Sequence, residues 1–165
     1  MNTIKINREP LLEPLNAVSG IIERRHTLPI LSNVLLEHSG LDITIVATDI
    51  EIQISARTVC DNPGEPKAIT VGARKLLDIL RALPEQSEVT LTLQEKKLQV
   101  KAAKSRFNLQ TLPAEDFPRL SLAEGASTKM TLPQKVLKQL FLSVQYAMAQ
   151  QDIRYYLNGL LLVTG

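Results

Sequence analysis

The side chains that could perform acid-base or metal chemistry in this sequence are few and widely spaced. Asp49 and Glu51 alternate in strand-like sequence, so both carboxylates would share one strand face and could act as a general acid and base. Unpaired, exposed strand carboxylates are much more common than catalytic pairs. His26 and His38 lie on different segments, with no cysteine or carboxylate at ligand spacing. We therefore expect neither a catalytic centre nor a metal site.

The glycines and the single cysteine argue against two further kinds of chemistry. A loop that cradles phosphate needs several neighbouring glycines, whereas the seven glycines here are scattered. We expect no nucleotide and no other cofactor. Cys60 has no second cysteine to form an internal disulfide, and we expect it to be a small, buried strand residue.

Positive charge gathers on segments that read as helices, where it could attract a polyanion. Residues 67–83 carry four bases and one acid, whereas residues 33–65 carry six acids and one base. A second helical segment, 133–148, carries Lys135 and Lys138 and no acid. Basic helices beside an acidic sheet would attract a polyanion from one side. Ordinary solvated surfaces would give the same pattern, so charge alone leaves both interpretations open.

Hydrophobic periodicity predicts the elements that must position these side chains. Apolar residues at helical spacing predict helices over 8–22, 72–83 and 133–148, although Pro14 should kink or delay the first. Ile50, Ile52 and Ile54 alternate strictly, which predicts a strand with one buried face. Turns are expected at 39–40 and 61–64. The predicted strands are 3–7, 34–38, 41–48, 50–60, 67–71, 89–93, 98–102 and 106–112. The fold class is α+β, with antiparallel sheet.

An internal repeat suggests how the chain is divided. With a shift of 126 positions, Leu11 matches Leu137 and Val18 matches Val144, and both copies read as strand, helix, cationic turn and apolar strand. We expect a complete first domain over 1–125 and the beginning of a second, truncated domain over 126–165. The composition, 44% hydrophobic and 22% charged, is typical of a globular protein. Charges interrupt every apolar run near the start, so we expect no signal peptide, no membrane span and a cytoplasmic location.

Four motifs, in order along the chain, resemble the beta subunit of bacterial DNA polymerase III, the sliding-clamp family. They are residues 27–31 (TLPIL), 47–51 (ATDIE), 111–118 (TLPAEDFP) and 151–159 (QDIRYYLNG). The resemblance implies a DNA-clamp fold, in which each module packs two helices on antiparallel sheet. It also implies a non-enzymatic processivity factor with three modules per subunit and a ring of two subunits. The implied partners are duplex DNA, a second copy, DNA polymerase III and the clamp loader.

The same resemblance implies DNA-binding residues, which should contact phosphates without reading sequence. Family positions map onto the cationic turn after the first helix of each module. The predicted helix 72–83 adds outward-facing cations. Tyr155 and Tyr156 could equally be core or rim residues of an apolar strand. The expected DNA-binding residues are Arg25, Arg74, Lys75, Gln151, Arg154, Tyr155 and Tyr156.

The resemblance also implies one side of a subunit interface. Phe107 and Leu109 match apolar interface residues, and Lys104 and Arg106 match ion-pair donors, all on an edge strand. Without its partner strand, Phe107 would be an exposed apolar group on an unpaired edge. Leu157 matches one residue of the pocket that receives a partner peptide.

Two other classes of function remain open at this point. A protein-binding module without a DNA role would use the acidic stretch as its working face. A small enzyme of unrecognised type would require a deep pocket that holds titratable groups with perturbed pKa values.

Overall fold

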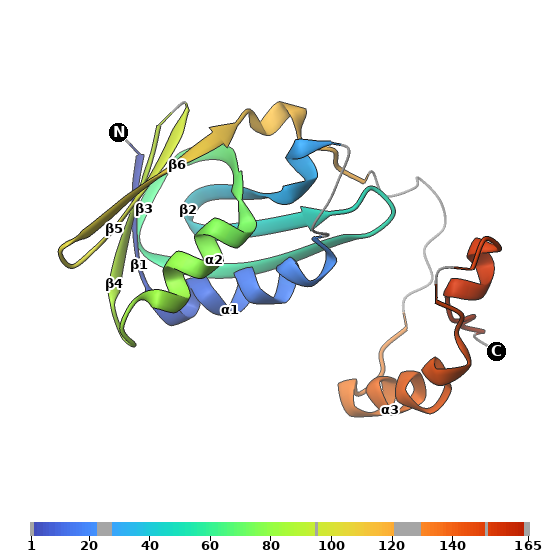
Figure 1. Cartoon of the computed structure of the whole chain (residues 1–165). Coiled ribbons are helices and arrows are strands. Elements are labelled where there is room, and N and C mark those ends of the chain that lie inside the picture. Colours follow the sequence, from blue (N-terminus) through green and yellow to red (C-terminus); the bar gives the residue numbers. More distant parts are fainter. Residues whose placement is uncertain (1, 23–27, 95, 121–129, 151, 164–165) are drawn as a thin grey trace. The chain divides into compact units, whose positions relative to one another are not determined.

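The computed structural model describes residues 2–22, 28–94, 96–120, 130–150 and 152–163. The chain divides into two compact units, Met1–Leu122 and Ala123–Gly165 (Figure 1). Each unit is considered by itself below. No helix in the described parts of either unit is long and apolar enough to cross a membrane.

The first unit is built on a six-stranded antiparallel sheet with the order β1-β4-β5-β6-β3-β2. Alternating burial along β4 and β5 places Val89, Leu91, Leu98 and Val100 on the face that forms the core. The α+β fold class is therefore confirmed. The strands are β1 (Asn2–Asn7), β2 (Asn33–Thr48), β3 (Gln53–Gly72), β4 (Glu88–Leu93), β5 (Lys97–Ala102) and β6 (Ser105–Leu112).

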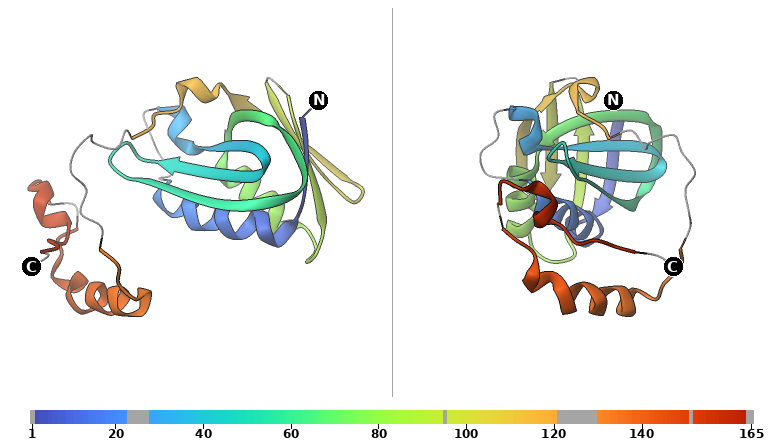
Figure 2. Two further views of the ribbon diagram at one scale, coloured as in Figure 1. Left: turned by 180° about the vertical axis from the view of Figure 1, so that it is seen from behind. Right: turned by 90° about the vertical axis from the view of Figure 1, so that its right-hand side faces the viewer.

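Two helices cover one side of this sheet (Figures 1 and 2). α1 (Arg8–Val18) continues into a short 3-10 helix, η1 (Ser19–Ile21), and packs against β2, β3 and α2 (Ala73–Ala82). α1 buries Leu11, Leu15 and Val18, and α2 buries Leu76 and Leu80. The regular helix begins at Arg8, so the predicted delay of the helix by Pro14 does not occur. Pro14 lies inside α1 and is buried.

The β2–β3 ribbon turns at a place that the sequence did not predict. Gly40 has a φ of 60° and marks a register shift, but β2 continues through the expected turn, and β3 likewise continues through residues 61–64. The chain reverses at residues 49–52 instead. Ile50, with a φ of 83°, and Ile52 are 48% and 54% exposed there, so the predicted buried alternation is wrong at these two residues.

A segment after β6 packs on a second, smaller apolar cluster. Phe117, directly after the 3-10 helix η3 (Ala114–Asp116), is buried with Leu35 and Val46. Arg119 forms an ion pair with Glu37 of β2. The Leu120 amide donates a hydrogen bond to the Gln53 side chain at 3.1 Å. We call residues 113–120 the strap, because these three contacts hold it to β2 and β3.

The second unit contains one helix and two 3-10 turns in its described part. α3 (Gln134–Val144) falls within the predicted helix 133–148, and none of its residues is buried. η4 (Gln145–Ala147) and η5 (Tyr155–Asn158) follow. Residues 160–163, expected to form an apolar strand, have no regular structure here, and Leu161 is exposed.

Candidate nucleic-acid interface and subunit edge

The first candidate surface is the exposed side of α2. Leu76, Leu77 and Leu80 point into the core, and the helical repeat therefore turns Arg74 and Lys75 outward, where both are exposed. Arg81 is also exposed, and its Nη2 donates a hydrogen bond to Asn16 Oδ1 of α1 at 2.7 Å. The described part of α2 thus carries three outward cations against a single acid, Asp78.

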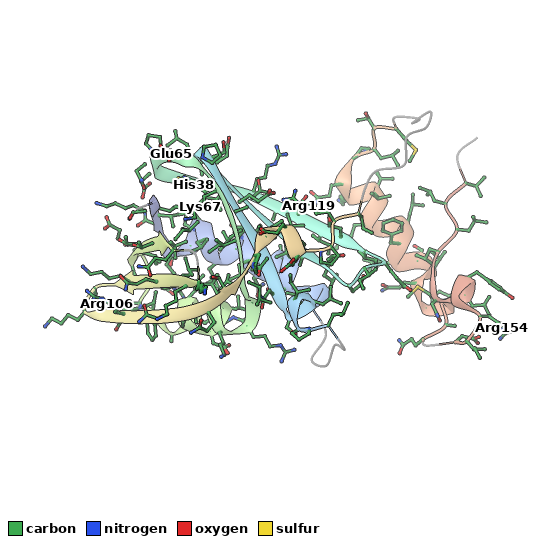
Figure 3. The ribbon with its side chains drawn as sticks, turned by 90° about the horizontal axis from the view of Figure 1, so that it is seen from above. His38, Glu65, Lys67, Arg106, Arg119 and Arg154 are labelled. Carbon is green, nitrogen blue, oxygen red and sulfur yellow. The ribbon has the colours of Figure 1, made fainter. Side chains whose placement is uncertain are left out.

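The second candidate surface is the free side of β6. Residues 105–110 pair with β5 along one side, and β3 joins the other side of β6 only at Thr111 and Leu112 in the described register. Lys104 lies in the turn that joins β5 to β6, and the next base, Arg106, is exposed at the outer margin of the unit (Figure 3). The expected edge is therefore present over residues 105–110, with Arg106 on it and Lys104 in the turn before it, although β6 as a whole lies between β5 and β3 in the sheet order.

The apolar residues of this edge differ from expectation. Phe107 was expected to be exposed. It is only partly exposed and packs against the main core, so this prediction is wrong for the part of the ring that the core covers. Leu109 is 8% exposed and belongs to that core. Its position opposite Leu98 of β5 sets this orientation, because directly paired residues share one sheet face.

A hollow of about 430 Å³ is lined by residues of both candidate surfaces, α2 and the free side of β6. Arg74 and Lys75 line one part of it, and Asn108, Leu109 and Gln110 of β6 line another. The sequence assigned these residues to different roles. In the fold, an anionic group seated beside the β6 edge would be within the field of the α2 cations.

The predicted residues of the second unit are only partly described. The Arg154 side chain donates to both carboxylate oxygens of Asp152, at 3.0 Å each. These bonds lower the pKa of Asp152, and they raise the pKa of Arg154. Tyr156 is 67% exposed, and Leu157 is half-buried in η5. Gln151 and Arg25 lie outside the described residues, as does the side chain of Tyr155.

The side chains considered for catalysis have other roles in the structure. Asp49 lies in the β2–β3 turn, where its Oδ1 accepts hydrogen bonds from the amides of Glu51 and Ile52 at 2.9 and 2.6 Å. The two carboxylates therefore do not share a strand face. Cys60 is buried on β3, as predicted.

Residues that the sequence treated as separate meet inside the sheet. His38 Nε2 lies 3.4 Å from Cys60 Sγ, because β2 and β3 pair in this region and their register shifts between His38 and Asp42. This contact was not predicted. Across the described ranges, no group of three or more potential metal ligands is present. A two-residue set does not supply the four ligands of an ordinary structural zinc site.

Comparison with known proteins identifies the family. Residues 2–121 match the family described as DNA polymerase III beta subunit, N-terminal domain. The chain belongs to this family. The beta sliding clamps of Pseudomonas aeruginosa and Escherichia coli K12 are 48% and 45% identical to it, over 95% and 96% of the chain.

Solved beta-subunit structures confirm the clamp fold. The chain superposes on the DNA polymerase III subunit beta from Pseudomonas aeruginosa with a TM-score of 0.89 and 47% identity, over 95% of the chain and 42% of that structure. A Caulobacter crescentus beta sliding clamp also gives a TM-score of 0.89, at 37% identity over 96% of the chain. The chain spans about 42% of the length of the first relatives it matches.

The contact between Arg8 and α2 was not predicted from the sequence. Arg8, in the first turn of α1, bonds to the last turn of α2. A signal was present, since a cation at the first position of a helix is electrostatically disfavoured. The bonding partner was not deducible from sequence, because it lies 72 positions away.

Proposed function

We propose that this chain is part of a DNA polymerase processivity factor that encircles duplex DNA as a ring of two subunits and tethers the replicative polymerase. Its role would be non-enzymatic and would need no cofactor. Its partners would be duplex DNA, a second subunit, DNA polymerase III and clamp-loader subunits, and it would act in the cytoplasm. The observation that carries the proposal is the clamp fold of the first unit, with exposed cations on one outward helix face.

The proposed domains are 1–125, a complete first clamp module, and 126–165, the start of a second. The division into units after Leu122 and the family match over residues 2–121 both support a boundary in this region. The uncovered apolar side chains of α3 also support it. Leu11 and Val18 are buried in α1, whereas their repeat partners, Leu137 and Val144, are not buried in the second unit.

The proposed DNA contacts are long-range and directed at phosphates. Arg74 and Lys75 would act from α2, and Arg25, Gln151, Arg154, Tyr155 and Tyr156 from the repeated turn. Contacts of this kind give affinity without sequence preference, which suits a ring that must move along DNA. The ion pair with Asp152 means that Arg154 would have to exchange this partner for a phosphate.

The proposed subunit contact uses the β6 edge. Lys104 and Arg106 would pair with acids of the other subunit, and a strand of that subunit would add to residues 105–110. Phe107 would contribute its exposed portion, and Leu109 would support it from the core. Leu157 would be one residue of a partner-peptide pocket.

Equilibrium binding to duplex DNA tests the DNA role. Fluorescence anisotropy of the 165-residue chain with two labelled duplexes of unrelated sequence should give weak, equal affinities. The logarithm of the binding constant should fall linearly with the logarithm of salt concentration. Binding that selects one sequence, or that ignores salt, would contradict the proposal. Absence of binding at low salt would favour a protein-binding module in its place.

A further inference from the structure

Arg8 occupies the end of its own helix that disfavours a cation. α1 begins at Arg8, and the N-terminus of a helix carries partial positive charge. Glu9, its neighbour, is the residue type favoured in a first turn. The Arg8 side chain is nevertheless only 14% exposed and is held in a defined position. The electrostatics of α1 therefore do not account for Arg8.

The contacts of Arg8 lie on α2. Its Nε donates a hydrogen bond to the Leu80 carbonyl oxygen at 2.6 Å, and its Nη2 lies 3.5 Å from the Arg81 carbonyl oxygen. These two carbonyls belong to the last turn of α2, where carbonyl groups lack partners within the helix. That end also carries partial negative charge. Arg8 thus provides a cation and two donors where α2 needs both.

Glu9 fixes the chain that leaves α2. Its Oε1 accepts hydrogen bonds from Arg8 Nη1 at 2.9 Å and from the Gln86 amide at 3.1 Å. Gln86 has a φ of 59°, and the adjacent Ser87 carbonyl accepts from the Arg8 amide at 2.9 Å. The Gln86 bond, followed by the Arg8 bond, lowers the pKa of Glu9. Residues 86–87 are therefore attached to the start of α1.

We propose that Arg8, supported by Glu9, is a positioning residue for the cationic face of α2. Arg8 fixes the last turn of α2 by bonding to the Leu80 carbonyl. The hydrogen bond from the Arg81 side chain to Asn16 of α1 fixes the same turn. Arg81 is then presented to a duplex phosphate at a defined place, and Arg8 itself contacts no DNA. This inference rests on the proposed DNA role of the chain.

The conservative variant Arg8→Lys separates positioning from direct contact. Lysine keeps the charge but cannot reach two carbonyls with a planar fork. If Arg8 positions Arg81, Arg8→Lys should weaken duplex binding about threefold, and Arg81→Gln should weaken it by a similar factor. The double variant should then bind no more weakly than Arg81→Gln alone. Arg57→Lys, at an exposed residue of β3, is the matched control and should bind as the parent chain does.

Amide hydrogen exchange supplies a readout that does not involve DNA. Arg8→Lys and Glu9→Gln should both accelerate exchange of the Gln86 amide, relative to amides in β4. Unchanged Gln86 exchange in both variants would overturn the inference. So would a threefold loss of affinity that is undiminished in the Arg81→Gln background. If Arg8→Lys does not fold by circular dichroism, Glu9→Gln replaces it in the same cycle. Its duplex affinity is then compared with that of Glu13→Gln, at an exposed residue of α1, because both changes remove one negative charge and so favour duplex binding equally.

The two proposals fail in different ways. If the parent chain shows no salt-dependent duplex binding, the proposed DNA function fails, and the DNA role of Arg8 fails with it. If the parent binds as expected and Arg8→Lys binds equally well, only the positioning role fails.

Discussion

Leu109→Ala tests whether a residue assigned to the subunit edge is instead part of the core of its own unit. Leu109 is 8% exposed, contacts the main apolar core and lies opposite Leu98. Truncating a buried leucine costs about 2–5 kcal/mol, from lost transfer free energy and from the cavity that remains. Leu109 also borders the hollow beside α2, where neighbouring groups have room to relax. We therefore expect the lower part of that range, about 2–3 kcal/mol.

Urea unfolding of the 165-residue chain, followed by circular dichroism, measures this loss. With a urea dependence of about 1.5–2 kcal/mol per molar, the midpoint should fall by about 1–2 M. Asn108→Ala is the matched control on the same strand, because Asn108 is exposed and makes one surface hydrogen bond, to Gln99. Its effect should stay below about 0.5 kcal/mol. Equal midpoints for the two variants would refute the placement of Leu109 in the core.

Three further predictions concern other parts of the chain. Phe117→Ala should lower the free energy of unfolding by about 2–4 kcal/mol and expose the strap to limited proteolysis, whereas Leu120→Ala, at an exposed residue, should do neither. Equal proteolysis rates would contradict the packing of the strap. Because the pKa of Glu9 is lowered in the folded state, its stabilisation should be full above its unfolded pKa and disappear as pH falls through its folded pKa. Urea midpoints of the parent and Glu9→Gln chains should therefore differ most near neutral pH and converge in acid, and a constant difference would contradict this. Amides of α3 should exchange with solvent much faster than those of α1, since an 11-residue helix without buried side chains is marginal in water. Comparable protection of the two helices would contradict the absence of buried side chains in α3.

Strict local periodicity was sufficient to predict much of the first unit. The spacing of Leu76, Leu77 and Leu80 predicted both α2 and the outward direction of its cations. The alternation in β4 and β5 predicted strands with one buried face, since a sheet side chain points inward at every second position. Where a single face of an element is buried, the sequence pattern and the fold carry the same information.

The pattern failed where hydrogen bonding overrides it. Ile50 and Ile52 alternate like strand residues. However, the side chains of Thr48 and Asp49 accept hydrogen bonds from the backbone amides of the turn, and these bonds hold Ile50 at a positive φ. Residues 61–64 contain turn-forming types, yet the Asn62 side chain bonds to the backbone of β1, and β3 continues through them. These partners lie 57 and 59 positions away, beyond the reach of local sequence patterns.

The candidate site divides in the same way. The outward cations of α2 follow from one helix repeat, whereas the hollow that they share with β6 depends on the packing of distant segments. Leu109 was assigned from resemblance as an interface residue, and only the register with β5 places it in the core. The contacts of Arg8 with α2 likewise require the folded pair of helices.

Retention on circular DNA tests the central claim most directly. Residues 2–121 of this chain would replace the matching module of the 48% identical Pseudomonas aeruginosa clamp, and the hybrid would be loaded onto nicked circular DNA beside the parent clamp. If the first unit is a ring module that encircles DNA, the hybrid should stay on the circle through gel filtration in salt and leave when the DNA is linearised. A hybrid that folds and dimerises but leaves circular and linear DNA equally fast would contradict the account.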